Sequence, residues 1–263
     1  MSASLDTQNT PTPGTGRPPR FGQLLNRVVL AGLLAGVAAG VFQLLVTERA
    51  ITPALDIEDA RNAAEAAASG SHEHSEELFT RHEQWFGGFL GTVLAGVIMA
   101  VVFAAVYAYV RHRLPGRTDV ARTAVLATIG FAVFAVLPAL KIPANPPAVG
   151  DPDTIGERTA IYGATLLCGV VIAVAASWLV GRLRRRGWSA SAVAASAVGV
   201  VVVLLAATLL LVPDSPDSIS SDVPAYVVWD FRLASLGQLA VLWTALGLGS
   251  GWLLDRWVRT PAR

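Results

Sequence analysis

Six long apolar runs constrain the fold of this chain more than any other feature of its sequence. Each is about 20 residues long, the length at which a helix rising 1.5 Å per residue crosses a hydrocarbon core roughly 30 Å thick. Inside lipid every backbone N–H and C=O must be paired within its own segment, so each run is expected to be a helix. No run alternates with a period of two, which argues against a barrel. The predicted spans are residues 28–46, 86–110, 123–140, 160–180, 192–212 and 233–254.

The charge content fits a chain whose helices are surrounded by lipid. Of the 263 residues, 53% are hydrophobic and 15% are charged, whereas a soluble domain carries about a quarter charged residues. The charges lie in short blocks between the apolar runs. We therefore expect an all-α polytopic membrane protein, a six-transmembrane-helix bundle. The first run is longer than the apolar region of a signal peptide, so we expect it to be a retained span.

Arginine and lysine divide unevenly between the two sides of the predicted bundle. The chain ends and the second and fourth connections hold 14 of the 20 basic residues and three of the 19 acids. Cytoplasmic segments of membrane proteins carry the basic excess, so we expect an N-in/C-in, multi-pass arrangement in the cell inner (cytoplasmic) membrane. The predicted domains are a disordered cytoplasmic tail 1–22, a membrane domain 23–258 with an external loop 47–85, and a cytoplasmic tail 259–263.

The external loop is acidic and contains three of the four histidines of the chain within eleven residues. Imidazole and carboxylate groups together suit borderline divalent cations such as cobalt, nickel and zinc. We therefore predict that this loop binds a metal ion. The alternative is a solvated acidic loop whose histidines have no dedicated role. The predicted metal ligands are His72, His74, His82, Glu73, Glu77 and Glu83.

The third connection is rich in proline, with five in the fifteen residues 138–152. Proline lacks an N–H donor and restricts the residue before it, so this stretch is expected to be neither helix nor central strand. Two interpretations stay open, a rigid external turn and a segment that dips back toward the membrane. Asp151 and Asp153 are expected to cap the fourth span rather than bind metal. The residues assigned to a possible pathway or structural motif are Lys141, Asn145, Asp151, Asp153, Asp230 and Arg232.

Polar residues inside the predicted spans are few, and none at mid-membrane depth is Asp, Glu, Lys or His. A proton relay or a tightly held ion at the bilayer centre is therefore not expected. The polar residues of the spans are Gln43, Thr92, Tyr107, Thr128, Thr165, Ser177, Gln238 and Thr244.

Motifs for soluble chemistry are missing from the sequence. It has no phosphate loop, dinucleotide fingerprint, zinc-protease helix or serine elbow, so we predict neither an enzyme nor a nucleic-acid-binding protein. The single cysteine, Cys168, excludes an intrachain disulfide. Glycines four residues apart on three spans are interpreted as helix-packing positions. They are Gly32, Gly36 and Gly40, then Gly87 and Gly91, and finally Gly247 and Gly251.

Two blocks of the sequence resemble one known family. Residues 140–162, LKIPANPPAVGDPDTIGERTAIY, are similar to the central motif of the CbtA family, which is described as predicted cobalt transporter subunits. Residues 229–238, WDFRLASLGQ, are similar to a second block of that family. The resemblance covers roughly residues 25–258. It departs from the family pattern at residues 79–84, FTRHEQ, where a run rich in Ser, Thr and Arg is expected.

The resemblance implies a membrane component of a divalent metal-ion uptake system, with Co²⁺ as the transported ion and no permanently bound cofactor. In this hypothesis the external His and carboxylate side chains capture the ion. The implied partners are the lipid bilayer and a small single-span, His-rich subunit (CbtB-like), and a homo-oligomer stays open. The alternative function is a non-transporting membrane subunit that binds or assembles another permease.

Overall fold

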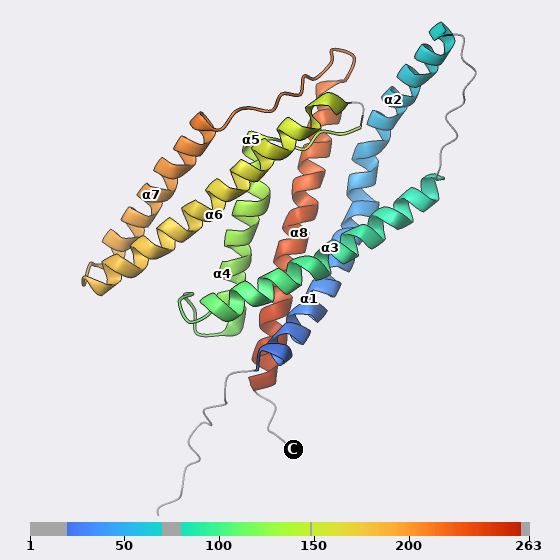
Figure 1. The fold of residues 1–263 in the computed structure, drawn as a ribbon. Coiled ribbons are helices and arrows are strands. Elements are labelled where there is room, and N and C mark those ends of the chain that lie inside the picture. The colour runs from blue at the N-terminus through green and yellow to red at the C-terminus, as the bar shows by residue number, and fades with distance from the viewer. Residues whose placement is uncertain (1–19, 70–79, 148, 259–263) are drawn as a thin grey trace, which may run out of the picture.

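The computed structural model describes residues 20–69, 80–147 and 149–258, and every regular element within these ranges is helical (Figure 1). Six helical stretches are long and apolar enough to cross a membrane, which confirms the predicted all-α polytopic fold. Two π-helical turns, η1 and η2, and one 3-10 turn, η3, interrupt or precede the α-helices. In chain order the elements are α1 (Phe21–Phe42), η1 (Gln43–Thr47), α2 (Glu48–Ser69), α3 (Arg81–Val110), α4 (Asp119–Phe131), η2 (Ala132–Val136), α5 (Leu137–Lys141), η3 (Pro152–Thr154), α6 (Ile155–Arg185), α7 (Ala190–Leu211) and α8 (Ala225–Val258).

The first membrane helix continues well beyond its predicted end at residue 46. α1, η1 and α2 follow one another as a continuous helix (Figure 1). Pro53 lies inside α2 without ending it. The rest of α2 is rich in alanine, glutamate and arginine, which are strong helix formers. Because α3 begins at Arg81, the stretch assigned to the external loop 47–85 is helical at both ends.

Four helices, α1, α3, α4 and α8, form the packed bundle of the molecule. Glycines bring α1 and α3 together: a Cβ atom on Gly36 would lie 2.8 Å from the Cα atom of Val93, and one on Gly96 would lie 2.7 Å from the Cα atom of Gly36. Gly247 and Gly251 of α8 likewise approach α4. Close backbone approach of this kind is the usual way in which helices associate in lipid.

The glycine pair of α3 behaves differently from the other predicted packing glycines. Cβ atoms built on Gly87 and Gly91 meet no other atom within 4 Å. The packing interpretation is therefore wrong for these two glycines within the described part of the chain. Spacing alone did not separate them from Gly32 and Gly36, because it identifies a helix face but not what covers that face.

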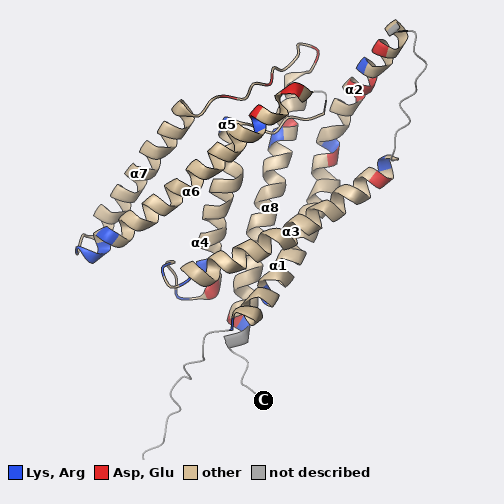
Figure 2. Ribbon diagram, viewed as in Figure 1, with Lys and Arg blue, Asp and Glu red and all other residues tan. Residues whose placement is uncertain are grey.

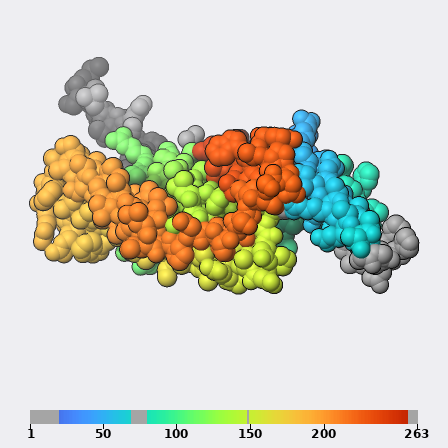
Figure 3. All heavy atoms as spheres, turned by 90° about the horizontal axis from the view of Figure 1, so that it is seen from above, coloured from blue at the N-terminus to red at the C-terminus, as the bar shows by residue number. Residues whose placement is uncertain are grey.

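The α6–α7 hairpin lies beside the bundle rather than inside it (Figures 1 and 3). α7 makes its contacts chiefly with α6, and α6 reaches the bundle through η2 and α5. Gly169 of α6 packs against Val133 and Leu137 at this junction. Elsewhere the hairpin presents large apolar side chains outward, such as Leu167 and Leu210. An apolar outer surface is what a lipid-surrounded helix pair requires.

Charged residues gather at two ends of the molecule and along α2, and the central stretches of the helices carry few of them (Figure 2). We call the end with Arg20, the α3–α4 connection, the α6–α7 turn and Arg256 the termini end, and the opposite end the loop end. At the termini end the Asp255 carboxylate accepts hydrogen bonds from the backbone N–H of Asp119 (2.8 Å) and Val120 (3.3 Å). α8 therefore caps α4, a role that an aspartate so distant in sequence does not reveal.

Candidate functional site

A cluster of hydrogen-bonded charges fastens the third connection at the loop end. Its centre is Asp217, whose side chain is only 3% exposed. The Asp217 carboxylate accepts hydrogen bonds from Asn145 Nδ2 (3.0 Å) and Thr154 Oγ1 (2.9 Å), and from the Arg158 guanidinium (3.2 Å). Arg232 in turn donates to Asn145 Oδ1 (2.9 Å). A buried carboxylate needs several donors, and those of Asp217 come from different segments. Together with Arg232, they tie the third connection to α6, α8 and the α7–α8 loop.

Lys141 joins α5 to the end of α7. Its ammonium group lies 2.5 Å from an Asp214 carboxylate oxygen and 3.0 Å from the carbonyl oxygen of Leu209. The Lys141 side chain is 5% exposed, whereas that of Asp214 is 91% exposed. The lysine stem is thus buried while its charged end is satisfied at the surface. This contact positions helices and leaves little of the ammonium group for a ligand.

The remaining predicted pathway residues divide into two kinds. The Asp151 carboxylate accepts a hydrogen bond from the backbone N–H of Asp153 (2.9 Å) and caps η3, just before α6. Within the described residues the carboxylates of Asp153 and Asp230 are exposed and make no side-chain hydrogen bond or ion pair. Val149 packs with valines of α8 and with Ala54 of α2, so the proline-rich connection lies across the loop end.

Two of the six predicted metal ligands, His82 and Glu83, lie within the described residues. His72, Glu73, His74 and Glu77 lie outside the described residues. The Glu83 carboxylate accepts hydrogen bonds from the Thr80 backbone N–H (2.7 Å) and Oγ1 (2.8 Å), a capping box at the start of α3. His82 is exposed, with its ring edge-on to Trp85 at 5.3 Å between centroids. No group of three His, Cys, Asp or Glu side chains suited to a metal ion occurs within the described ranges.

A polar network inside the bundle is the arrangement that the sequence did not predict. It joins three separate membrane helices, through Gln43 and Thr47 of η1, Thr92 of α3 and Gln238 of α8. Thr92 Oγ1 donates to Gln43 Oε1 (2.5 Å), and Gln238 Nε2 lies 3.3 Å from the same oxygen. Thr47 Oγ1 donates to Gln238 Oε1 (3.0 Å). Three of these residues were noted as polar groups in spans, but helical periodicity cannot show that different helices bring them together.

Local backbone features make room for this network. Gln43 begins the π-helical turn η1, and such turns occur often at functional sites because they re-aim side chains out of the α-helical register. A Cβ atom on Gly88 would lie 2.6 Å from Gln43 Nε2, and one on Gly237 would lie 3.0 Å from the Phe42 ring. Gly88 of α3 therefore leaves the space that the Gln43 side chain occupies, and Gly237 of α8 leaves space for the neighbouring Phe42 ring.

The network lies near the loop-end boundary of the spans and contains only neutral groups. Counted at 1.5 Å per residue, Gln43, Thr92 and Gln238 are roughly 5 to 9 Å inside the predicted span ends. Amide and hydroxyl oxygens can coordinate a cation, yet without a carboxylate they bind it weakly. Polar groups in lipid stay paired with one another when no ligand is present, as these are.

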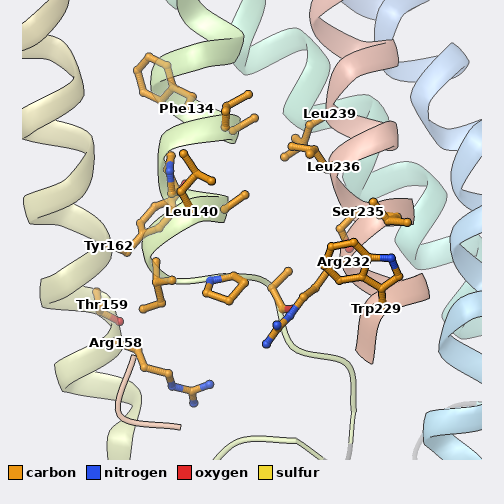
Figure 4. Close-up of a pocket in the computed structure, with 18 of the residues that line it drawn as sticks. Phe134, Leu140, Arg158, Thr159, Tyr162, Trp229, Arg232, Ser235, Leu236 and Leu239 are labelled. Carbon is orange, nitrogen blue, oxygen red and sulfur yellow. The ribbon is translucent and has the colours of Figure 1, made fainter. Parts of the chain in front are cut away.

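A cavity of about 800 Å³ opens between α5, α6 and α8 (Figure 4). Its walls are largely apolar, with Phe134 and Leu140 on one side and Leu239 on the other. Two arginines, Arg158 and Arg232, line it at the loop end (Figure 4). The cavity is thus an apolar groove with positive charge at one end only.

The fold and these sites define a multi-pass α-helical membrane protein whose charges lie at its two ends and along α2, and whose bundle contains a small polar network. The chain belongs to the CbtA family: the family model described as "Probable cobalt transporter subunit (CbtA)" matches residues 21–255. This confirms the resemblance carried by the two sequence blocks. No curated protein and no solved structure matches the chain.

Proposed function

We propose that this chain is the membrane subunit through which Co²⁺ enters the cell, and that the ion crosses the outer part of the bilayer beside the network of Gln43, Thr47, Thr92 and Gln238. One observation carries the proposal: in a member of a cobalt transporter family, oxygen-bearing side chains from three spans meet and bond to one another within the bundle. Weak, neutral ligands suit passage, because an ion in transit must bind well enough to enter and loosely enough to leave.

The membrane potential is sufficient to drive such an uptake. Moving one charge inward is worth about 2.3 kcal/mol per 100 mV, hence about 4.6 kcal/mol for a divalent ion. The sequence contains no ATP-binding motif, so the energy comes from this potential or from a partner subunit. The proposed orientation puts both termini in the cytoplasm of a cell whose inner membrane holds the protein, with the loop end outside.

The external loop supplies the ion in this proposal. His72, His74 and His82, with Glu73, Glu77 and Glu83, capture Co²⁺ from dilute solution, since imidazole and carboxylate groups suit a borderline cation. His82 and Thr92 lie on the same helix, ten positions apart, which corresponds to about 15 Å along its axis. α3 thus leads from the capture loop to the network. A small His-rich single-span partner is proposed to assist at this step.

The test is Co²⁺ uptake into proteoliposomes that contain the wild-type chain or the variants Gln43→Leu and Gln238→Leu, with Ni²⁺ and Zn²⁺ as competitors. We expect saturable cobalt entry that falls about tenfold or more in each variant, since about 1.4 kcal/mol of lost stabilisation is a factor of ten. Thr128→Val is the matched control, because Thr128 is exposed on α4 and bonds only to its own helix at Ala124. Unchanged flux in both glutamine variants would remove the network from the path.

The histidines are tested separately from the network. Replacing His72, His74 and His82 together with alanine is expected to raise the cobalt concentration needed for half-maximal uptake and to leave the maximal rate unchanged, because capture precedes transit. An unaltered concentration dependence would exclude the capture role.

A second candidate function is a non-transporting subunit that binds or assembles another permease. The observation that favours it is the absence of any Asp, Glu, Lys or His at mid-membrane depth in the sequence. If the folded protein passes no cobalt with or without its partner, the assembly role replaces the transport role.

A further inference from the structure

The apolar groove between α5, α6 and α8 has two arginines at its loop end. Within the described structure only one of them, Arg158, forms an ion pair with a carboxylate. We propose that this groove binds one anionic phospholipid, with the phosphate on Arg232 and Arg158 and the acyl chains along the apolar walls. The site is distinct from the polar network of the bundle, which involves η1, α3 and Gln238 of α8.

Arg232 supplies the first argument, because its charge has no acidic partner in the described part of the chain. Its guanidinium group donates to the carbonyl oxygen of Ala144 (3.2 Å) and to Asn145 Oδ1 (2.9 Å), both of which are neutral. Among the described residues no carboxylate lies within ion-pair distance of it. A cation at the edge of the hydrocarbon core is costly without an anion, so a phosphate group there offsets that cost.

Arg158 supplies the second argument, because one of its donors is left over. Its NH1 group pairs with Asp217, and its NH2 group lies 3.4 Å from the carbonyl oxygen of Asp151. Its Nε atom is buried and has no hydrogen-bond partner among residues 20–69, 80–147 and 149–258. A buried donor of this kind is rare in a folded protein, and it indicates a ligand or water that completes the site. Figure 4 places Arg158 and Arg232 at the same end of the groove.

The length of the groove matches one leaflet of a bilayer. On α8 its lining runs from Trp229 to Leu239, ten positions or about 15 Å along the helix, which is half of a hydrocarbon core roughly 30 Å thick. A partner helix that crosses the membrane needs the full thickness, so a lipid fits this groove better than a second span does. Trp229 and Tyr162 also line the groove, and both residue types favour the level of the headgroups.

Filling the groove has a structural consequence for the hairpin. Of the walls, Leu140 belongs to α5, Thr159 and Tyr162 to α6, and Leu236 to α8. The chains of one lipid therefore contact both the bundle and the hairpin, and its phosphate bridges Arg158 on α6 to Arg232 on α8. Bound lipid is expected to hold α6 against the bundle where few protein contacts do so.

The experiment is native mass spectrometry of the purified full chain, exchanged from mixed micelles that contain phosphatidylglycerol and phosphatidylcholine at equal concentration. We expect one phosphatidylglycerol to be retained about tenfold more often than phosphatidylcholine, in keeping with charge-assisted hydrogen bonds from two arginines. Arg232→Gln is expected to abolish this preference. Arg184→Gln, an exposed arginine at the termini end, is the matched control and is expected to keep it.

A second variant tests the groove without touching either arginine. Leu236→Trp fills the apolar wall, and we expect it to reduce retention of both lipids while the chain stays folded, as judged by its circular dichroism. Equal retention of the two lipids by the wild type, or an unaltered preference in Arg232→Gln, would overturn the proposal. So would displacement of the lipid by millimolar inorganic phosphate, or a bound polypeptide in place of lipid. These readouts do not depend on cobalt flux, so the lipid proposal and the proposed transport function can fail independently of each other.

Discussion

The four-helix bundle and the α6–α7 hairpin are held together by different forces. In the bundle, glycines let α1 approach α3 and let α8 approach α4 until backbones touch. The hairpin has few such contacts, and it is joined to the rest at the loop end through the buried carboxylate of Asp217 and the ammonium group of Lys141. In lipid, where no hydrophobic effect drives helices together, close packing and polar contacts are the two available sources of association. In this protein close backbone packing predominates within the bundle, where the polar network adds to it. Polar contacts predominate where the hairpin joins the bundle, with Gly169 as a close-packed position there.

Removing the central carboxylate of the hairpin contact is expected to have the largest effect. Asp217→Ala leaves Arg158 and Asn145 without their acceptor in a buried place, which costs about 4 kcal/mol by comparison with broken buried ion pairs. We expect hydrogen exchange to accelerate in α6 and α7 and to stay slow in α1 and α3. Asp230→Ala is the control, since that carboxylate is exposed and unpaired among the described residues. Uniform acceleration across all helices would show that the two regions are not independent.

A change in the bundle is expected to have the next largest effect. In Gly36→Ala the added methyl group meets the Val93 backbone, with Cα and carbonyl oxygen both 2.8 Å away, and we expect a loss of about 2 kcal/mol in unfolding free energy. Gly199→Ala on α7 is the matched control because nothing lies within 4 Å of its Cβ position. That variant gains helix propensity, up to about 1 kcal/mol. Denaturant titration in mixed micelles measures the unfolding free energy of both variants. If both substitutions changed it in the same direction, the proposed difference between bundle and hairpin would be wrong.

The smallest effect is expected at the outer end of α2, and it depends on pH. The Arg61 guanidinium, hydrogen-bonded to the Asp222 carboxylate at 2.8 Å, lowers the pKa of that carboxyl. A group whose pKa falls on folding stabilises the folded state above its unfolded pKa, about 3.9 for Asp, and loses this contribution as pH falls through the lower folded value. We expect the contact between α2 and the α7–α8 loop to weaken only below about pH 4.

Distance measurements between spin labels on α2 and on the α7–α8 loop check this expectation. The labelled wild type should show a broader distance distribution at about pH 3 than at about pH 6, on either side of the carboxyl pKa range. Arg61→Gln should be broad at both values. A wild-type distribution that narrows in acid would contradict the assigned sign.

The fold was largely predictable from the sequence, whereas the sites were not. Apolar runs of bilayer length predict six helices because lipid leaves the backbone few alternatives. The meeting of Gln43, Thr92 and Gln238 depends on which helices are neighbours, and each residue alone has the appearance of an isolated polar group in a span. Asp217 similarly has no motif around it, although it fastens four segments.

The length of the first helix also escaped prediction, for a different reason. Hydropathy detects where a helix leaves lipid, but it does not detect where the helix ends. Residues 47–69 have the composition of a soluble helix, so the helix continues as α2 after the apolar run stops. Pro53 removes one backbone donor there without breaking the helix.

That long helix provides a way to measure the orientation of the protein in the membrane. The stretch Phe21–Ala68 has 48 residues, hence a length of about 72 Å, which exceeds the 40 to 45 Å of a bilayer with its headgroups. Even when it is tilted, a rod of this length leaves several turns standing in water beyond one membrane face. A cysteine substituted for the exposed residue Ala67 is thus accessible to membrane-impermeant thiol reagents from one side of the membrane only. Whether intact cells or only lysed cells accept the label tells which way the whole molecule is inserted.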